Sequence, residues 1–297
     1  MDKQWKFHNV NQVAPGVLLV EFNRVNRAPV NAFNDDMWKE LREIVDTTSV
    51  SPEIRAIVLS SALDKVFTAG LDLNAQSELN STALDPARKA LQLREHVLDF
   101  QDAISALERC TQPVICAMYG TSVGLAIDLA CACDVRIASE NTTFGIFEVN
   151  VGLAADIGTL QRLPKIVGNE SKVRELALTG RKFGALEARD MGFLSEVIKG
   201  GRGEVIAAAV EMAKAIASKS PIAVLGTKHL INHARDHTVE EGLKYTAIWN
   251  ASMLQSVDTA TAMKAVMSKQ IPKFPPISDR KQSTSAAKAK AKAKAKL

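Results

Sequence analysis

Short apolar runs and longer stretches with helical spacing alternate along the first part of the chain. Four β-branched apolar runs predict strands, at residues 17–22, 54–60, 113–119 and 134–139. Between them, apolar residues recur at helical spacing in a segment that begins behind Asn34-Asp35 and in His96–Arg109. Residues 120–124 read as a turn into an apolar helix that runs through Cys133. Strands that alternate with helices in this way indicate an α/β architecture.

The pattern changes after Gly203, where the chain becomes helical. Breaks at Ser220-Pro221 and Asp258 separate four predicted helices, over residues 205–218, 222–234, 239–254 and 259–267. We therefore expect a core over 1–200, a C-terminal helical region over 201–270 that packs against a neighbour, and a disordered Lys/Ala-rich tail over 271–297. Segment 75–88 is polar and is predicted to be a mobile loop.

Composition and charge argue against a membrane-spanning, a secreted or a nucleic-acid-binding protein. The chain has 297 residues, and no apolar run is long enough for a membrane span. Its polar N-terminus does not indicate secretion, so we expect the four cysteines to be buried free thiols. The formal charge of +4 comes from five lysines in the last ten residues, and without them it is −1. The body therefore offers no basic surface for a nucleic acid.

Three acidic residues lie in apolar surroundings. They are Asp128 in VGLAIDLACAC, Glu148 in FGIFEVNV and Asp156 in VGLAADIGTL. Such surroundings raise the pKa of a carboxyl group and suit it to proton transfer near neutral pH. Each acid could instead cap a helix or pair with a cation, and Asp156 could cap a helix over 157–166. Because three such acids lie within thirty residues, we favour a catalytic role.

Two glycine-containing turns supply a second element of chemistry. Ala69-Gly70-Leu71-Asp72 follows a predicted strand, and residues 120–124 join a strand to a helix. Backbone N–H groups at such turns can stabilise a developing negative oxygen.

Two other motifs allow different functions. Gly120-x-Ser122-x-Gly124 matches the nucleophile elbow of serine esterases, with Asp156 and His229 following in the order that such a triad requires. His229, His233 and His237 recur every four residues, a spacing that could hold a metal. The polar residues between the histidines favour an exposed polar face instead, and no metal site is predicted.

From Val17 to about Met267 the chain resembles the crotonase (enoyl-CoA hydratase/isomerase) superfamily. The resemblance lies in FTAGLDL from Phe67, PVICAMYG from Pro113 and, most specifically, EVNVGLAADIGTLQRLPK from Glu148. The last segment is very similar to the dienoyl-CoA isomerase branch, which has acids at the positions of Asp128, Glu148 and Asp156. The resemblance implies an α/β spiral of ββα repeats with a C-terminal helical trimerisation region.

The resemblance also implies a reaction and a site. A 3,5-dienoyl-CoA would become a 2,4-dienoyl-CoA, with Asp156 as base, Glu148 as acid and Asp128 nearby, without a metal or other cofactor. The thioester oxygen would rest between the backbone N–H groups of Leu71 and Leu125, with Ala69, Gly70, Asp72 and Gly124 lining the substrate. Hydration of a 2-enoyl-CoA and isomerisation of a 3-enoyl-CoA are the nearest alternatives.

Two further expectations concern the second turn and the C-terminus. The family has a run of glycines where this chain has Gly124-Leu125-Ala126-Ile127, so we expect the Leu125 side chain to narrow the site or shift the acyl chain. The ending Ala295-Lys296-Leu297 is close to the Ser-Lys-Leu address that a peroxisomal import receptor reads. We therefore expect a homotrimer or homohexamer in the peroxisome matrix, with a fatty acyl-CoA thioester as substrate.

Overall fold

The computed structural model describes residues 3–24, 30–72 and 84–277, and within them ten strands form two sheets. The first sheet is parallel apart from its β1–β2 edge, in the order β1 (His8–Ala14), β2 (Val17–Phe22), β3 (Ala56–Ser61), β5 (Val114–Met118), β7 (Val135–Ser139) and β10 (Glu196–Ile198). The second sheet comprises β4 (Val66–Thr68), β6 (Thr121–Val123), β8 (Thr143–Gly145) and β9 (Lys182–Gly184), with β9 antiparallel to β8.

Successive repeats give one strand to each sheet and then a helix. Strands β3 and β4 precede α2 (Pro86–Arg109), and β5 and β6 precede α3 (Leu125–Ala132). Strands β7 and β8 lead to the 3₁₀ helix η2 (Glu148–Val151) and to α4 (Thr159–Ile166). The chain therefore winds as a spiral of ββα units, which confirms the predicted fold class.

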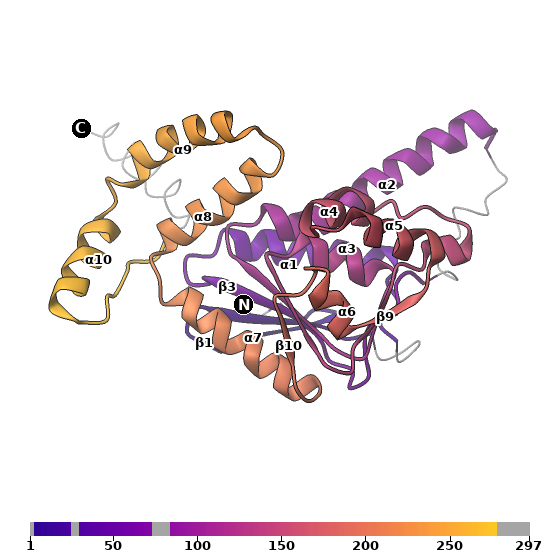
Figure 1. The fold of residues 1–297 in the computed structure, drawn as a ribbon, viewed down its shortest axis with the longest axis horizontal. Helices are drawn as coiled ribbons and strands as arrows, with labels where there is room; N and C mark the ends of the chain where they lie inside the picture. The colour runs from indigo at the N-terminus through magenta and orange to yellow at the C-terminus, as the bar shows by residue number, and fades with distance from the viewer. Residues whose placement is uncertain (1–2, 25–29, 73–83, 278–297) are drawn as a thin grey trace, which may run out of the picture.

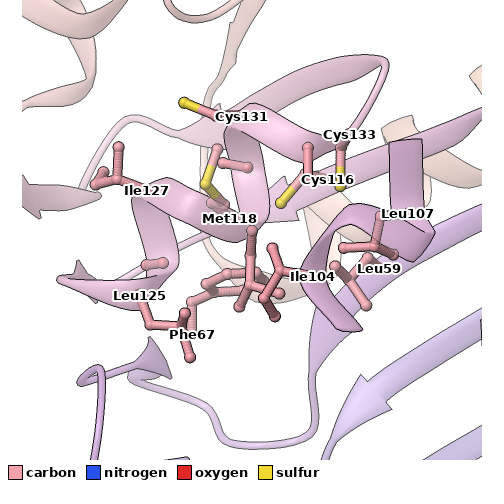
Figure 2. Packing of buried hydrophobic residues seen from close by; sticks show 14 of the residues in the cluster. Leu59, Phe67, Ile104, Leu107, Cys116, Met118, Leu125, Ile127, Cys131 and Cys133 are labelled. Carbon is pink, nitrogen blue, oxygen red and sulfur yellow. The ribbon is translucent and has the colours of Figure 1, made fainter. Parts of the chain in front are cut away.

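The first sheet is buried on both faces, as its continuous apolar strands require. Helices α1 (Asp35–Ser49), α2 and α3 share one core with every second residue of β2, whereas Val17 and Leu19 face α7 (Arg202–Ala217). Helix α7 presents Val205 and three buried alanines, small side chains that allow close contact with the sheet. Figure 2 shows the first core, where side chains from α2 and α3 meet residues of the strands.

The remaining helices are α5 (Glu170–Thr179), α6 (Ala185–Asp190), α8 (Pro221–Ala234), α9 (Val239–Met253) and α10 (Val257–Ser268). Helix α7, which the sequence groups with the C-terminal helices, packs across the sheet. Helix α8 lies against the body, whereas α9 and α10 extend away from it (Figure 1). Among the described residues, the cysteines are free and buried as predicted, and no helix is long and apolar enough to cross a membrane.

Side-chain caps decide where two of the helices begin. The Asn34 side chain accepts a hydrogen bond from Met37 N at 3.1 Å and caps α1 as predicted. The Asp85 side chain caps α2, so residues 86–88, which were predicted to belong to a mobile loop, are helical. The part of that predicted loop over 75–83 lies outside the described residues.

Two other expectations are also corrected by local contacts. Residues 121–123, predicted as a turn, form strand β6, because β4 and β8 lie on either side to pair with it. Residues 272–277, predicted to be disordered, return to the body, where the Arg55 guanidinium donates to Phe274 O at 2.8 Å. The rest of the predicted tail, 278–297, lies outside the described residues.

Candidate active site

The first glycine turn follows β4 and pairs with the chain at Phe33. Phe33 N donates to Gly70 O, and Asp72 N donates to Phe33 O, both at 2.8 Å. Successive N–H groups of an extended strand point to opposite sides, so Leu71 N–H points away from Phe33. The Asp72 carboxylate, predicted to line the substrate, forms an ion pair with Arg24 at 2.7 Å.

The second turn is Gly124, which connects β6 to α3. Gly124 has φ +58°, a left-handed conformation that glycine adopts without strain, and its N–H donates to Gly145 O at 2.9 Å. Leu125 then begins α3, where the first N–H groups of a helix have no partner within the helix. Within the described residues, neither Leu71 N–H nor Leu125 N–H is hydrogen-bonded to protein.

The two turns lie against each other although they are far apart in the sequence. A Cβ atom placed on Gly70 would lie 3.4 Å from Val123 O and 3.7 Å from Leu125 N. This proximity brings the two predicted N–H donors to one place, as stabilisation of a single oxygen requires.

Glu148 lies beside this pair of turns. A Cβ atom placed on Gly124 would lie 3.6 Å from Glu148 Oε1, while Oε2 is buried and has no hydrogen-bond partner. Burial raises the pKa of Glu148 above its usual value, and the negative charge of Asp156 raises that pKa further. The geometry suits a carboxyl group that holds a proton beside the turns.

Asp156 is more open to solvent than the sequence suggests. Its side chain is exposed, although the surrounding protein still desolvates the carboxylate and raises its pKa. The charge of His96 opposes that rise, and the Gln101 side chain holds the backbone by donating to Asp156 O at 2.6 Å. The alternative role as a helix cap is wrong, because α4 begins after Gly158 and has no side-chain cap.

Asp128 is the most deeply buried of the three acids, with 2% of its surface exposed. Its Oδ1 atom accepts hydrogen bonds from the backbone N–H and the hydroxyl of Thr159, both at 2.7 Å. Desolvation raises the pKa of Asp128 to about 7, and the charges of Glu148 and Asp156 contribute to the rise. Asp128 is therefore poised to exchange a proton near neutral pH.

The Leu125 side chain does not narrow the site, contrary to expectation. It is 2% exposed and belongs to the core, close to Phe67 in Figure 2. Because the side chain enters the core while the N–H remains without a protein partner, the second turn does not need a glycine at this position.

The esterase motif and the histidines serve structural roles. Ser122 is completely buried within β6 and donates to Tyr119 O at 3.4 Å, so it is not displayed as a nucleophile. His229 hydrogen-bonds Tyr245 Oη at 2.8 Å, and His233 stacks on the same ring. His229 and His233 thus pack α8 against α9, whereas His237 is exposed beyond the end of α8. The described residues include no cluster that could hold a metal.

Thr159 and Gln101 were not identified from the sequence. Each acts through a contact with a residue distant in the chain, Asp128 in one case and Asp156 in the other. A single Thr or Gln carries no periodic or motif signal, so only the folded arrangement reveals these roles.

A spiral of ββα repeats with two facing glycine turns and adjacent carboxylates defines an enzyme of the crotonase fold. The chain belongs to the enoyl-CoA hydratase/isomerase family, whose model matches residues 12–275. It is 42% identical over 266 residues to the mitochondrial Delta(3,5)-Delta(2,4)-dienoyl-CoA isomerase of Homo sapiens, an alignment that spans 89% of this chain and 80% of the relative.

A second relative and a solved structure also resemble this chain over most of its length. The chain is 41% identical to the peroxisomal Delta(3,5)-Delta(2,4)-dienoyl-CoA isomerase of Arabidopsis thaliana, over 84% of this chain and 90% of the relative. The crystal structure of an enoyl-CoA hydratase from Bacillus anthracis superposes with a TM-score of 0.81 at 27% identity, covering 91% of this chain and 99% of that one.

Proposed function

We propose that this chain isomerises 3,5-dienoyl-CoA to 2,4-dienoyl-CoA in the β-oxidation of unsaturated fatty acids. The observation that carries the proposal is the position of Glu148 against the Gly124 turn, with Asp156 and Asp128 close enough to shift carboxyl pKa values. Similarity to named dienoyl-CoA isomerases over most of the chain supports the same reaction.

The two turns would stabilise the charge that forms on the thioester oxygen. Loss of a C2 proton gives a trienolate that is conjugated from the thioester oxygen to C6, and the N–H groups of Leu71 and Leu125 can donate to its oxygen. A single lost donor of this kind typically costs about 10²–10³ in rate. Ala69, Gly70 and Gly124 would form the walls beside that oxygen, and the Arg24 ion pair would hold Asp72 and the first turn in place.

The environments of the two proton carriers assign their roles. Asp156 is exposed and lies near His96, so it is the better candidate for the ionised base that takes the C2 proton. Glu148 is more buried and feels the charge of Asp156, so it is suited to deliver a proton to C6. One proton leaves and one arrives while the double bonds move, and the reaction therefore needs no redox cofactor.

The assembly and the compartment form part of the proposal. Exposed apolar side chains on α8–α10, including Val266 and Met267, support a homotrimer or homohexamer built on these helices. The relatives named above are mitochondrial in humans and peroxisomal in Arabidopsis, which supports an organelle that oxidises fatty acids. The ending Ala295-Lys296-Leu297 favours the peroxisome through its import receptor.

A panel of acyl-CoA substrates tests the reaction. We expect the purified protein to convert a 3,5-dienoyl-CoA to the conjugated 2,4-dienoyl product, followed by ultraviolet absorbance. Faster hydration of a 2-enoyl-CoA, or faster isomerisation of a 3-enoyl-CoA, would replace the proposal with the corresponding activity of the same family.

Deleting residues 295–297 should abolish binding to the peroxisomal import receptor, whereas deleting 288–294 should leave binding intact.

A further inference from the structure

Asp128 is held by one side chain that the proposed reaction does not otherwise use. The hydroxyl of Thr159 and its backbone N–H both donate to Oδ1, at 2.7 Å, and both donors are buried. Within the described residues, Oδ2 of Asp128 accepts no hydrogen bond. The two oxygens of this carboxyl group are therefore inequivalent.

We propose that Thr159 is a positioning residue that fixes the orientation of the Asp128 carboxyl group and the oxygen that carries its proton beside the two proton carriers, Glu148 and Asp156. Because Oδ1 already accepts two hydrogen bonds, a proton on Asp128 resides on Oδ2. Thr159 thus selects both the rotamer of Asp128 and the oxygen that is available to the substrate and to the other carboxylates. The inference rests on the proposed function, since it names a further residue for the same reaction.

Helix α4 is anchored so that Thr159 can perform this role. Arg162, one turn further along α4, donates to Ser105 Oγ at 2.8 Å and pairs with Glu108 at 3.0 Å, both on α2. Gly158, just before Thr159, has φ +142°, a backbone conformation that disfavours other residues and turns the chain into the helix. The donor pair is therefore held by a helix that is also anchored to α2.

The Thr159 hydrogen bonds favour the ionised form of Asp128, whereas the other surroundings of Asp128 disfavour it. Glu148 and Asp156 place negative charge near Asp128 and disfavour its ionised form, as does burial. The two Thr159 hydrogen bonds are the interactions that favour ionisation. Removing the hydroxyl should therefore make Asp128 harder to ionise.

Three variants at this position test the proposal in the full-length protein. Thr159→Val keeps the shape without the hydroxyl, Thr159→Ser keeps the hydroxyl without the methyl group, and Thr159→Ala removes both. We expect Thr159→Val and Thr159→Ala to lower kcat on a 3,5-dienoyl-CoA about tenfold or more, with little change in KM. Thr159→Ser should keep most of the wild-type kcat. The pH dependence of kcat should shift to higher pH in Thr159→Val and return in Thr159→Ser.

A direct titration separates this inference from the proposed function. The carboxyl carbon of Asp128, assigned by its absence in Asp128→Asn, can be followed by carbon-13 NMR without any substrate. Its midpoint should rise by about one pH unit in Thr159→Val, because a charge-assisted hydrogen bond is lost. An unchanged midpoint in folded Thr159→Val, or a Thr159→Ser variant as impaired as Thr159→Val, would overturn the proposal. If the wild-type protein does not act on the dienoyl substrate, only the proposed function fails, because the titration still reports on Thr159.

Discussion

The three carboxylates of the site have different exposures, and each difference has a chemical consequence. Asp128 is enclosed, Glu148 is half-buried beside the turns and Asp156 reaches solvent. A buried carboxyl group resists ionisation, whereas an exposed one can exchange its proton with water. The site therefore contains one acid that retains a proton easily, Asp128, and one that can lose a proton easily, Asp156.

Burial of Asp128 should make stability depend on pH. Its pKa is raised from 3.8 to about 7, so the native state binds this proton more tightly than the unfolded state. Stability from this group is fully present below about pH 4 and is lost as pH rises through about 7, a change on the order of a few kcal/mol. We expect urea unfolding to show this fall in wild type and a flatter profile in Asp128→Asn. Equal pH profiles for the two proteins would contradict the assignment.

Gly70 should be required for catalysis more than for folding. Its φ is +95° and a Cβ would meet Val123 O at 3.4 Å, so an alanine would strain the turn and displace Leu71 N–H. We expect Gly70→Ala to lower kcat by about 10²–10³, the typical effect of one lost donor. Gly16→Ala is the matched control, because Gly16 has φ +75° and also meets its neighbours at 3.4 Å, but lies in the β1–β2 connection. Similar kcat values for the two variants would argue against the proposed donor.

Some of these residues could be predicted from the sequence and others could not. Asp128, Glu148 and Asp156 were identified because each interrupts an apolar run. The exposure of Asp156 and the inward orientation of Leu125 depend on how distant segments pack, which local patterns do not record.

At the scale of elements, a buried lysine attaches α8 to the body. Lys228 Nζ lies 2.8 Å from Asp134 Oδ2 and donates to Leu107 O and Gln112 O, at 3.0 and 2.9 Å. Asp134 also accepts from Val114 N at 2.7 Å. One side chain therefore joins α8 to the end of α2 and to the starts of β5 and β7.

Breaking this contact should destabilise the protein. We expect Lys228→Met to lower the free energy of unfolding by about 2–3 kcal/mol, below the range for a fully buried pair, because it leaves the half-buried Asp134 carboxylate without its cation. The double variant Lys228→Met, Asp134→Asn should recover part of the loss. Chemical denaturation measures both, with exposed Lys244→Met as the control. A loss in Lys228→Met no larger than in the control would show that the ion pair contributes little.

Among the longer elements, agreement with the predicted ranges varies, since α2 begins at Pro86 and not at His96. Strand β2 and helices α8 and α9 agree closely with their predicted ranges because their patterns span enough residues. Strands β4, β6, β8 and β9 have three residues each, too few to show alternation. Their strand conformation comes from pairing with one another, so the second sheet could be predicted only through the family resemblance.

At the scale of the whole molecule, the C-terminal helices expose a large apolar surface. Val266 and Met267 are 79% and 87% exposed, and other exposed apolar side chains lie along α9 and the earlier part of α10. An apolar surface of this kind marks an interaction site in a soluble protein. Helices α9 and α10 extend away from the body (Figure 1), which leaves their exposed side chains available for the proposed contact with another copy of the chain.

Charges on this surface should prevent assembly. We expect Val266→Asp with Met267→Asp to shift the protein to smaller species in sedimentation velocity. Leu178→Asp on α5 is the control, because Leu178 is 76% exposed but lies outside α8–α10, and it should leave the assembly unchanged. A single unchanged species in the double variant would mean that these residues do not form the interface.

The central claim is that Asp156 and Glu148 move a proton between C2 and C6. It is tested most directly by following a 3,5-dienoyl-CoA in heavy water with Asp156→Asn and Glu148→Gln. We predict that Asp156→Asn neither isomerises the substrate nor exchanges its C2 hydrogen. Glu148→Gln should incorporate deuterium at C2 while forming almost no 2,4-diene, because the exposed base still exchanges with solvent. Isomerisation in both variants at rates near wild type would contradict the account.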